Sequence, residues 1–290
     1  MRIALHGRIN REDSLAYLDQ IIEEIEANHS EVVITPELLH SAHKHFTCKK
    51  PEVIESKADL SSVDYFFSLG GDGTLLETVS KVGSLETPIL GINLGKLGFL
   101  ATINKKDIKP ALGRFFAKEF SFDERMLIHL DSNHSIFNGQ NFALNEVAIL
   151  KRDTSSMIIV HCYIDGEFVN TYWADGLMVS TPTGSTGYSL SAGGPLVLPQ
   201  SDSFIITPVS PHNLNVRPLI VSGSSIISFE IEGKGRSFLT SLDSRSYKVD
   251  NSISLSVRKE SFCAKLIKLK GYNFFDTLRQ KLNWGLDIRN

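Results

Sequence analysis

A single carboxylate lies among glycines in the segment Gly70-Gly71-Asp72-Gly73-Thr74. Glycines let the backbone turn sharply and approach a phosphate without a Cβ atom in the way, and the free amides at a helix start attract anions. In such a loop the Asp72 carboxylate could accept a proton or orient a nucleophile. The alternative is a plain strand-to-helix turn in which Asp72 only caps the helix. The segment indicates phosphate chemistry, with a helix expected to start near Thr74.

A second segment, from Asp175 to Pro195, concentrates hydroxyl groups and glycines around one aromatic side chain, Tyr188. This composition forms no amphipathic element, and it suits a loop that hydrogen-bonds a sugar and a heterocycle. Tyr188 would offer a ring face, and Asp175 an acceptor for amide or ribose donors. The alternative is a Ser/Thr-rich surface connection. It is less favoured because the segment sits between apolar strands, where polar groups need partners.

Two polar residues, Asn145 and Glu146, interrupt the apolar stretch 142–150. At least one of their side chains must face the buried or ligand side of a strand. A hydrogen-bonded core Asn or an edge Glu explains the pattern about as well as a ligand contact does.

Other site chemistries have little support in the sequence. His40, His43, His45 and Cys48 lie in a Lys-rich stretch without a second ligand pair, so no metal site is predicted. The stretch 183–187 lacks the first glycine of a nucleophile elbow, which argues against a serine hydrolase. The common phosphate-loop and dinucleotide fingerprints are also missing.

Composition narrows the class of protein. The 290 residues are enough for two domains, and the net charge of -3 argues against broad binding to nucleic acids or acidic membranes. The three cysteines, Cys48, Cys162 and Cys263, are unclustered and odd in number, which favours a reducing compartment over a disulfide framework. Neither a signal peptide nor an apolar run of 18 residues is found, so we expect a cytoplasmic protein.

The elements that position the glycine–Asp segment follow a βα pattern over residues 1–120. Short apolar strands are predicted at 2–5, 32–34, 65–69 and 88–92. Between the first two, Leu15, Leu18, Ile22 and Ile25 form a helical stripe, with Asp13 or Ser14 as N-cap. The pattern predicts a doubly wound α/β domain. Ligands of such domains bind beyond the carboxyl ends of the strands, and residues 70–74 follow one such end.

From residue 121 to 270 the pattern changes to successive strands. Ile227, Phe229 and Ile231 alternate with polar residues, and Asp165-Gly166 predicts a tight hairpin, so this region should be an antiparallel β domain. In the tail, 271–290, the spacing of Phe274 or Phe275, Leu278 and Leu282 predicts a helix with Gly285 as its C-cap glycine. We expect this tail to pack back on the first domain.

Across these segments the chain resembles the NAD kinase family. The resemblance spans essentially the whole chain and rests on residues 70–74, 91–100, 145–146 and 175–195. Diacylglycerol and sphingosine kinases share the glycine–Asp motif, and that of phosphofructokinases is similar, so the motif alone indicates a kinase superfamily. Thr181 to Pro195 is far more selective.

The resemblance implies an enzyme that transfers the γ-phosphoryl group of ATP, with Mg²⁺, to the 2′-hydroxyl of the adenosine ribose of NAD. It implies an N-terminal α/β domain, a C-terminal β-sandwich-like domain, NAD in a cleft between them, and a homodimer or homotetramer. Asp72 would be the catalytic base, and Lys96 is a candidate helper at the phosphates. The residues implied to contact the dinucleotide are Gly73, Phe99, Asn145, Glu146, Asp175, Thr183, Thr186, Gly187, Tyr188, Ser189, Leu190 and Ser191.

Three positions depart from the common family pattern. Gly187 stands where many relatives have alanine, Arg245 where many have glutamine, and Trp173 where a polar residue is frequent. Two alternative functions stay open: a lipid kinase of the same superfamily, and a non-catalytic NAD-binding regulator. The lipid kinases usually show a Pro-x-Gly-Thr-Gly-Asn-Asp segment after the glycine–Asp motif, and residues 91–100 stand there instead.

Overall fold

The structure is a computed structural model that describes residues 1–9, 14–43, 45–47, 51–95, 98–152, 157–232 and 237–285. The chain divides into two compact units, Met1–Glu124 with Ala264–Asn290, and Arg125–Cys263. The boundaries lie inside the long strands β7 (Phe120–Ser132) and β18 (Leu255–Leu269), each of which contributes to both units. The second boundary precedes the one expected at 270/271, because Leu266 at the end of β18 pairs with Ile89 of the first unit.

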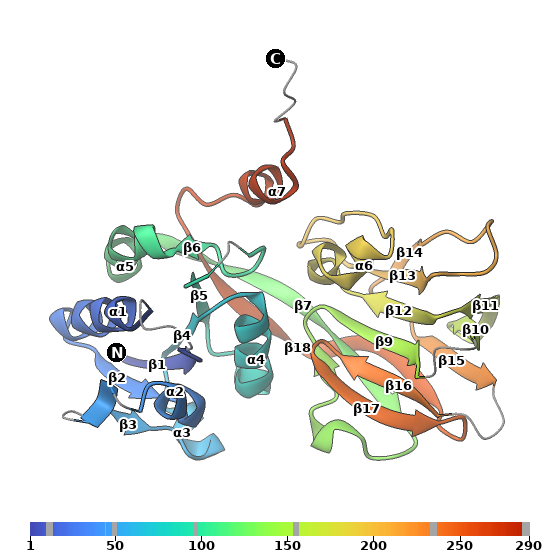
Figure 1. Cartoon of the computed structure of the whole chain (residues 1–290), viewed down its shortest axis with the longest axis horizontal. Helices are drawn as coiled ribbons and strands as arrows, with labels where there is room; N and C mark the ends of the chain where they lie inside the picture. Colours follow the sequence, from blue (N-terminus) through green and yellow to red (C-terminus); the bar gives the residue numbers. More distant parts are fainter. Residues whose placement is uncertain are drawn as a thin grey trace. The chain divides into compact units, whose positions relative to one another are not determined.

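The first unit is built on a parallel sheet in the order β5-β4-β1-β2-β3 (Figure 1). Its strands are β1 (Arg2–Gly7), β2 (Glu31–Ile34), β3 (Glu52–Val53), β4 (Tyr65–Leu69) and β5 (Ile89–Asn93), and short β6 (Ile103–Asn104) pairs with β5. Strands β2 and β3 follow on one side of β1, whereas β4 and β5 follow on the other. The sheet therefore has a topological switch point between β1 and β4. The predicted doubly wound α/β class is confirmed.

Between these strands lie the helices α1 (Leu15–Ala27), α2 (Pro36–Ser41), α3 (Lys57–Ser61) and α4 (Asp72–Val82), with the 3₁₀ turns η2 (His45–Thr47) and η3 (Gly83–Leu85). The turn η4 (Lys105–Asp107) and helix α5 (Ile108–Phe116) follow β6, and α7 (Phe274–Leu282) follows β18, the last strand of the described chain. In α1 the buried stripe is Leu18, Ile21 and Ile25, and Ser14 is the N-cap, while Asp13 lies outside the described residues. Leu18, Ile21 and Ile25 belong to the apolar core of the first unit.

The C-terminal helix α7 ends earlier than the sequence predicts. Its C-cap is Asn283 in the left-handed conformation, not Gly285. Asparagine tolerates this conformation, and the amides of Asn283 and Trp284 both donate to the Arg279 carbonyl, which closes the last turn. Leu278 is the buried residue of the helix, and residues 264–290 belong to the first unit.

The second unit pairs its strands in antiparallel fashion. One sheet has the order β14 (Leu219–Ser222), β13 (Ser203–Val209), β12 (Gly176–Ser180), β9 (Glu146–Lys151), β16 (Ser237–Leu242) and β17 (Arg245–Asp250). The other contains β11 (Glu167–Ala174), β10 (Ile158–Ile164), β15 (Ile227–Glu232) and β18, with β7 beside β18 and short β8 (Phe142–Ala143) beside β7. The 3₁₀ turns η5 (Phe137–Gly139) and η6 (Thr183–Thr186) and the short helix α6 (Tyr188–Ser191) complete this unit.

One apolar core is shared by the two sheets of the second unit. It joins Val147, Val179 and Phe204 from the first sheet with Val160 and Phe229 from the second. This is the predicted β-sandwich-like arrangement, and alternate residues on the inward-facing side of each strand supply the core.

The predicted hairpin of the second unit is confirmed. Ile164 pairs with Glu167, and both turn residues between them have positive φ, 52° at Asp165 and 86° at Gly166. Such values suit a two-residue turn whose twist matches that of the strands. In the part of the chain that the structure describes, no helix combines the length and the apolar character needed to cross a membrane.

Candidate active site

Asp72 is the first residue of α4, and Gly71 is the N-cap. The sequence predicted a helix start near Thr74, which is two residues too late. An acidic side chain is favoured in the first helical turn, and Gly70 leaves the room that the turn needs. A Cβ atom on Gly70 would lie 2.2 Å from Thr74 Oγ1, so a larger residue would block this start. The carboxylate therefore sits at the positive end of the helix.

The Asp72 carboxylate is fixed by three consecutive backbone amides. Oδ2 accepts from the amide of Phe99 at 2.8 Å, and Oδ1 accepts from those of Leu100 and Ala101, each at 3.0 Å. Gly98 makes this approach possible, because a Cβ atom there would lie 1.9 Å from Asp72 Oδ1. Oδ2 receives one amide rather than two, so it keeps a lone pair for a further donor.

Gly73 and Phe99, two residues implied to contact the dinucleotide, lie beside this carboxylate. Gly73 is exposed, and a Cβ atom added there would meet nothing within 4 Å. The Phe99 ring is half-buried, with Lys281 Nζ of α7 at 5.5 Å from its centroid. Lys96, the candidate helper at the phosphates, lies outside the described residues.

In the second unit, Asp243 fixes the segment that contains Asn145 and Glu146. Its carboxylate accepts from the amides of Leu144, Asn145 and Glu146 at 2.9, 2.8 and 3.2 Å. Arg245 stands out in the sequence of this region as a departure from the family pattern, whereas Asp243 was not predicted as a support. One signal could have found it: an Asp-Ser pair directly after an apolar strand is typical of a turn, and Asp243 indeed has a φ of 51°.

The loop after β12 packs directly on this segment. Thr181 donates from Oγ1 to the Leu144 carbonyl at 2.5 Å and from its amide to the Asn145 carbonyl at 2.8 Å. A Cβ atom on Gly184 would lie 2.2 Å from the Asn145 carbonyl oxygen, and one on Gly187 would lie 3.3 Å from Glu146 Oε2. The structure thus brings the predicted residues Asn145, Glu146 and Gly187 together.

Glu146 and Asn145 have side-chain atoms without partners. Within the described part of the chain, Glu146 Oε2 and Asn145 Oδ1 are buried and accept no hydrogen bond. Burial and, to a smaller extent, the neighbouring Asp243 carboxylate together raise the pKa of Glu146 to about 8. Glu146 is therefore largely protonated at pH 7, and its carboxyl group can donate one hydrogen bond and accept another.

The hydroxyl groups predicted to line the pocket are mostly satisfied within the chain. Thr183 Oγ1 accepts from Arg125 Nη1 at 3.2 Å, and Thr186 Oγ1 donates to the Thr183 carbonyl at 3.1 Å. The buried Ser189 hydroxyl lies 2.9 Å from that of Thr207. These three hydroxyls shape the loop. Arg125 was not predicted, because nothing in its local sequence links it to Thr183.

Three further residues of this segment, all in α6, are more accessible. Tyr188 is 42% exposed, Ser191 is exposed and Leu190 is half-buried. Their side chains can reach a ligand without displacing a core contact.

Asp175 is paired with a cation that the sequence did not predict as a partner. Its Oδ1 lies 2.6 Å from Lys151 Nζ, and its backbone amide donates to the Val209 carbonyl. Asp175 is half-buried at the start of β12, whereas Trp173, two residues earlier, is 51% exposed. The ion pair leaves the second carboxylate oxygen for other donors.

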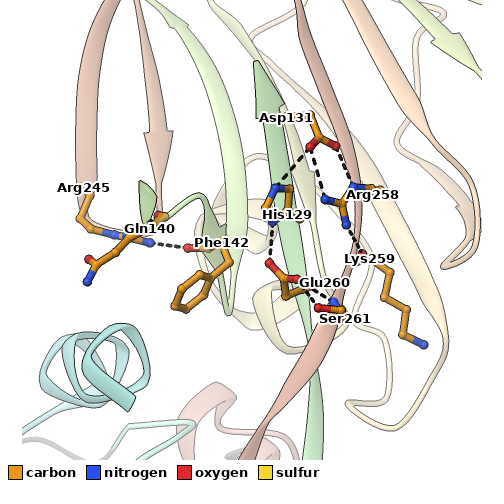
Figure 2. A network of polar contacts seen from close by, with 9 residues as sticks. All are labelled: His129, Asp131, Gln140, Phe142, Arg245, Arg258, Lys259, Glu260 and Ser261. Atoms are coloured by element: carbon orange, nitrogen blue, oxygen red, sulfur yellow. Dashed lines mark hydrogen bonds and ion pairs between the residues drawn. The ribbon is translucent and has the colours of Figure 1, made fainter. Parts of the chain in front are cut away.

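Arg245 is engaged by the backbone of its own unit, as Figure 2 shows. Its Nη1 donates to the Gln140 carbonyl at 2.8 Å, and Nη2 donates to the Phe142 carbonyl. The guanidinium also stacks over the rings of Phe137 and Phe142. Arg245 therefore ties β17 to the segment 137–142.

A second polar network in Figure 2 joins β7 to β18. His129 Nδ1 lies 2.5 Å from Glu260 Oε2, and Asp131 pairs with Arg258 at 2.8 Å. Burial alone raises the pKa of Glu260, but hydrogen bonds from the Ser261 amide and His129 outweigh it, so that this pKa is lowered. All these charges have partners in the network.

The histidines considered for a metal have other contacts. His45 Nε2 lies 2.6 Å from Asp19 Oδ1, and His43 Nδ1 lies 3.1 Å from the His40 carbonyl. Cys48 lies outside the described residues.

Two protein-family models match the chain. One, the ATP-NAD kinase N-terminal domain, matches residues 3–120, and the other, the ATP-NAD kinase C-terminal domain, matches residues 144–269. The NAD kinase of Cytophaga hutchinsonii is 50% identical to this chain over 300 residues, and that of Christiangramia forsetii is 39% identical over 294 residues. Both comparisons cover 100% of each chain.

Solved structures of similar fold are also known. An NAD kinase from Archaeoglobus fulgidus in complex with ATP matches with a TM-score of 0.76 and 27% identity, over 98% of this chain and 99% of that chain. Yeast NADH kinase complexed with NADH matches with a TM-score of 0.88, over 100% of this chain and 89% of that chain. Its identity of 23% shows a common fold.

Proposed function

The chain belongs to the NAD kinase family, and we propose that it transfers the γ-phosphoryl group of ATP to the 2′-hydroxyl of the adenosine ribose of NAD, forming NADP. The observation that carries the proposal is the 50% identity to an NAD kinase over the complete length of both chains. A match over both units covers the glycine–Asp segment and the Asn145-Glu146 segment together. Neither segment alone would specify both donor and acceptor.

In this proposal Asp72 is the catalytic base. Because Oδ1 already accepts from two amides and Oδ2 from one, Oδ2 is the oxygen that takes the proton of the attacking hydroxyl. Phosphoryl transfer through a loose transition state demands alignment more than covalent chemistry. The three backbone hydrogen bonds to Asp72 keep its carboxylate in place and so provide that alignment.

The acceptor dinucleotide is proposed to bind through the residues that the family resemblance implies. Support comes from Asn145 Oδ1 and Glu146 Oε2, which are buried, lack partners in the described part of the chain and would gain them from a ribose or adenine. The remaining proposed contacts are Gly73, Phe99, Asp175, Thr183, Thr186, Gly187, Tyr188, Ser189, Leu190 and Ser191. For Thr183, Thr186 and Ser189 the contacts would be made by backbone groups, since their hydroxyls are engaged.

The donor is proposed to be ATP with its Mg²⁺, which neutralises phosphate charge. Mg²⁺ typically binds to substrate phosphates and keeps several waters. Among the described residues, no group of three or more His, Cys, Asp and Glu is placed to hold a metal ion. The ion is proposed to bind the phosphates of the nucleotide as part of the substrate.

The proposal also includes a homodimer or homotetramer in the cytoplasm. The oligomer rests on the family resemblance, and the reducing compartment on the few unclustered cysteines.

The test is a panel of acceptors incubated with ATP and Mg²⁺. NAD, NADH and a lipid alcohol are offered separately, and ADP and the phosphorylated acceptor are measured. The proposal predicts NADP from NAD and no lipid phosphate. A phosphorylated lipid without NADP would favour the lipid kinase, and binding of NAD without turnover would favour the non-catalytic regulator.

A further inference from the structure

The loop that follows β1 lies beside the glycine–Asp segment, at the switch point of the first unit's sheet. In the parallel pairing of β1 with β4, Gly7 lies opposite Leu69, the residue before Gly70. A Cβ atom on Gly7 would lie 2.3 Å from the Leu69 carbonyl oxygen, so glycine permits this close approach. Arg8 therefore leaves the sheet next to Gly70, where ligands of doubly wound sheets bind.

An ion pair with α4 holds Arg8 at this edge. Its Nη1 lies 2.6 Å from Glu77 Oε1, and Glu77 belongs to the helix that Asp72 begins. The second oxygen of Glu77 lies 3.5 Å from Nε2 of the fully buried His6. The Arg8 side chain is 54% exposed, and within the described ranges Glu77 is its one recorded partner. Because a guanidinium carries five N–H donors, Arg8 retains donors for a ligand.

Arg8 also supplies a positive charge beside Asp72. The described residues that follow β1, β4 and β5 are 8–9, 70–71, 94–95 and 98–102, and Arg8 is the one lysine or arginine among them. Cβ positions on Gly71 and Gly73 meet no atom within 4 Å, so the surface beside Asp72 is open. A planar guanidinium matches two phosphate oxygens at once, which makes arginine well suited to such a site.

We propose that Arg8, paired with Glu77, binds a phosphate group of a substrate at the switch point between β1 and β4. The phosphate belongs either to the triphosphate of ATP or to the pyrophosphate of NAD. The inference rests on the proposed function for the choice of these two substrates. It adds the Arg8 side-chain cation to the glycine amides of this site.

The experiment measures equilibrium binding, which does not depend on turnover. Arg8→Met, Arg8→Lys and the wild-type chain are titrated by calorimetry with ATP and Mg²⁺ and, separately, with NAD. Arg8→Met is expected to weaken one of these affinities by roughly tenfold to a hundredfold, as for loss of a charge-assisted hydrogen bond. Arg8→Lys keeps the charge without the planar fork and should fall in between. The substrate whose affinity falls is the one whose phosphate group binds Arg8.

Arg2 provides the matched control, since it lies at the opposite end of the same strand and pairs with Glu31 and Glu52. Arg2→Met should leave both affinities within about twofold of wild type. If Arg8→Met also binds both substrates within about twofold of wild type, the inference is overturned, even though NADP is formed. If Arg8→Met loses affinity but the wild-type chain forms no NADP, the inference stands and the proposed function fails.

Discussion

Two aspartates, one in each unit, hold functional segments by the same device. Asp72 accepts from the consecutive amides of residues 99–101, and Asp243 accepts from those of residues 144–146. Hydrogen bonds from amides to a carboxylate are charge-assisted and stronger than those between neutral groups. Each carboxylate thus fixes a short stretch of backbone that carries residues proposed to contact the dinucleotide.

Replacing Asp72 by asparagine tests the base. The substitution removes the proton acceptor, so kcat should fall by a factor on the order of 10²–10⁴. It also turns an NH₂ group toward at least one backbone amide, which should cost about 1–3 kcal/mol of stability. The sequence alone, which does not show these amide contacts, predicts little effect of the substitution on folding. Turnover of the two proteins is compared at equal folded fraction, which urea unfolding establishes. Near-normal turnover of Asp72→Asn would show that Asp72 is not the catalytic base.

Glu146 should make stability depend on pH. Its pKa is raised from 4.5 to about 8 in the folded chain by burial and by Asp243. The folded state therefore favours the protonated form of Glu146. The stability that this protonation contributes to the folded state is fully present below pH 4.5 and is lost as pH rises toward 8. The slope is at most ~1.4 kcal/mol per pH unit for one group. Urea unfolding from pH 5 to 8 should show a flatter profile for Glu146→Gln, and identical profiles would contradict the assignment.

Sequence alone could single out Asp72, Asn145 and Glu146 as candidate site residues, because each stands out from its neighbours. It could not reveal Asp243 as the support of Asn145 and Glu146, or Arg125 as the partner of Thr183, since those contacts join residues far apart in the chain. Side-chain partners of this kind depend on how strands pair, which local patterns do not encode.

At the scale of elements, the loop after β12 depends on its contact with the Asn145 backbone. Because a Cβ atom on Gly184 would lie 2.2 Å from the Asn145 carbonyl oxygen, Gly184→Ala must displace the loop or the strand start. We expect a loss of about 1–3 kcal/mol, as for other overpacked interiors, and a raised KM for NAD.

Gly113→Ala is the control for that substitution. It lies within α5, where a Cβ atom meets nothing within 4 Å, and should stabilise the helix by about 0.5–1 kcal/mol. Thermal unfolding and KM are measured for both variants. Equal effects of the two alanines would show that the close contact at Gly184 has no importance.

Asp243→Asn tests the support of the Asn145-Glu146 segment. Its amide group would meet three backbone donors, so the segment should shift and KM for NAD should rise several-fold, with a smaller effect on kcat than Asp72→Asn has. Steady-state kinetics at saturating ATP separate these parameters. An unchanged KM for NAD would mean that the segment keeps its place without the carboxylate.

Element types were predictable where hydrophobic periodicity was strong. Strand β4 is found where the sequence predicted it, and the Asp165-Gly166 hairpin forms because both residues accept positive φ. The start of α4 and the end of α7 were misplaced, since local contacts at Gly70 and Arg279 decide them. Strand order, including the switch point that places Arg8, required the structure.

For the whole molecule, the β-strand edges favour association. The edge strand β14 exposes Leu219 and Ile220, and the edge strand β11 exposes Phe168 and Trp173. Exposed apolar edge strands in soluble proteins are commonly covered by a partner. Light scattering should therefore give twice or four times the mass of one chain. A monomer at micromolar concentration would contradict the proposed homo-oligomer.

The proposed reaction places a phosphate on one defined oxygen of NAD. The most direct test is to isolate the product formed from NAD, ATP and Mg²⁺ and to locate its new phosphate by ³¹P and ¹H NMR, with ADP measured in parallel. We expect one ADP for each product molecule and a phosphate on the 2′-oxygen of the adenosine ribose. A phosphate at any other position, or ADP without phosphorylated dinucleotide, would contradict it.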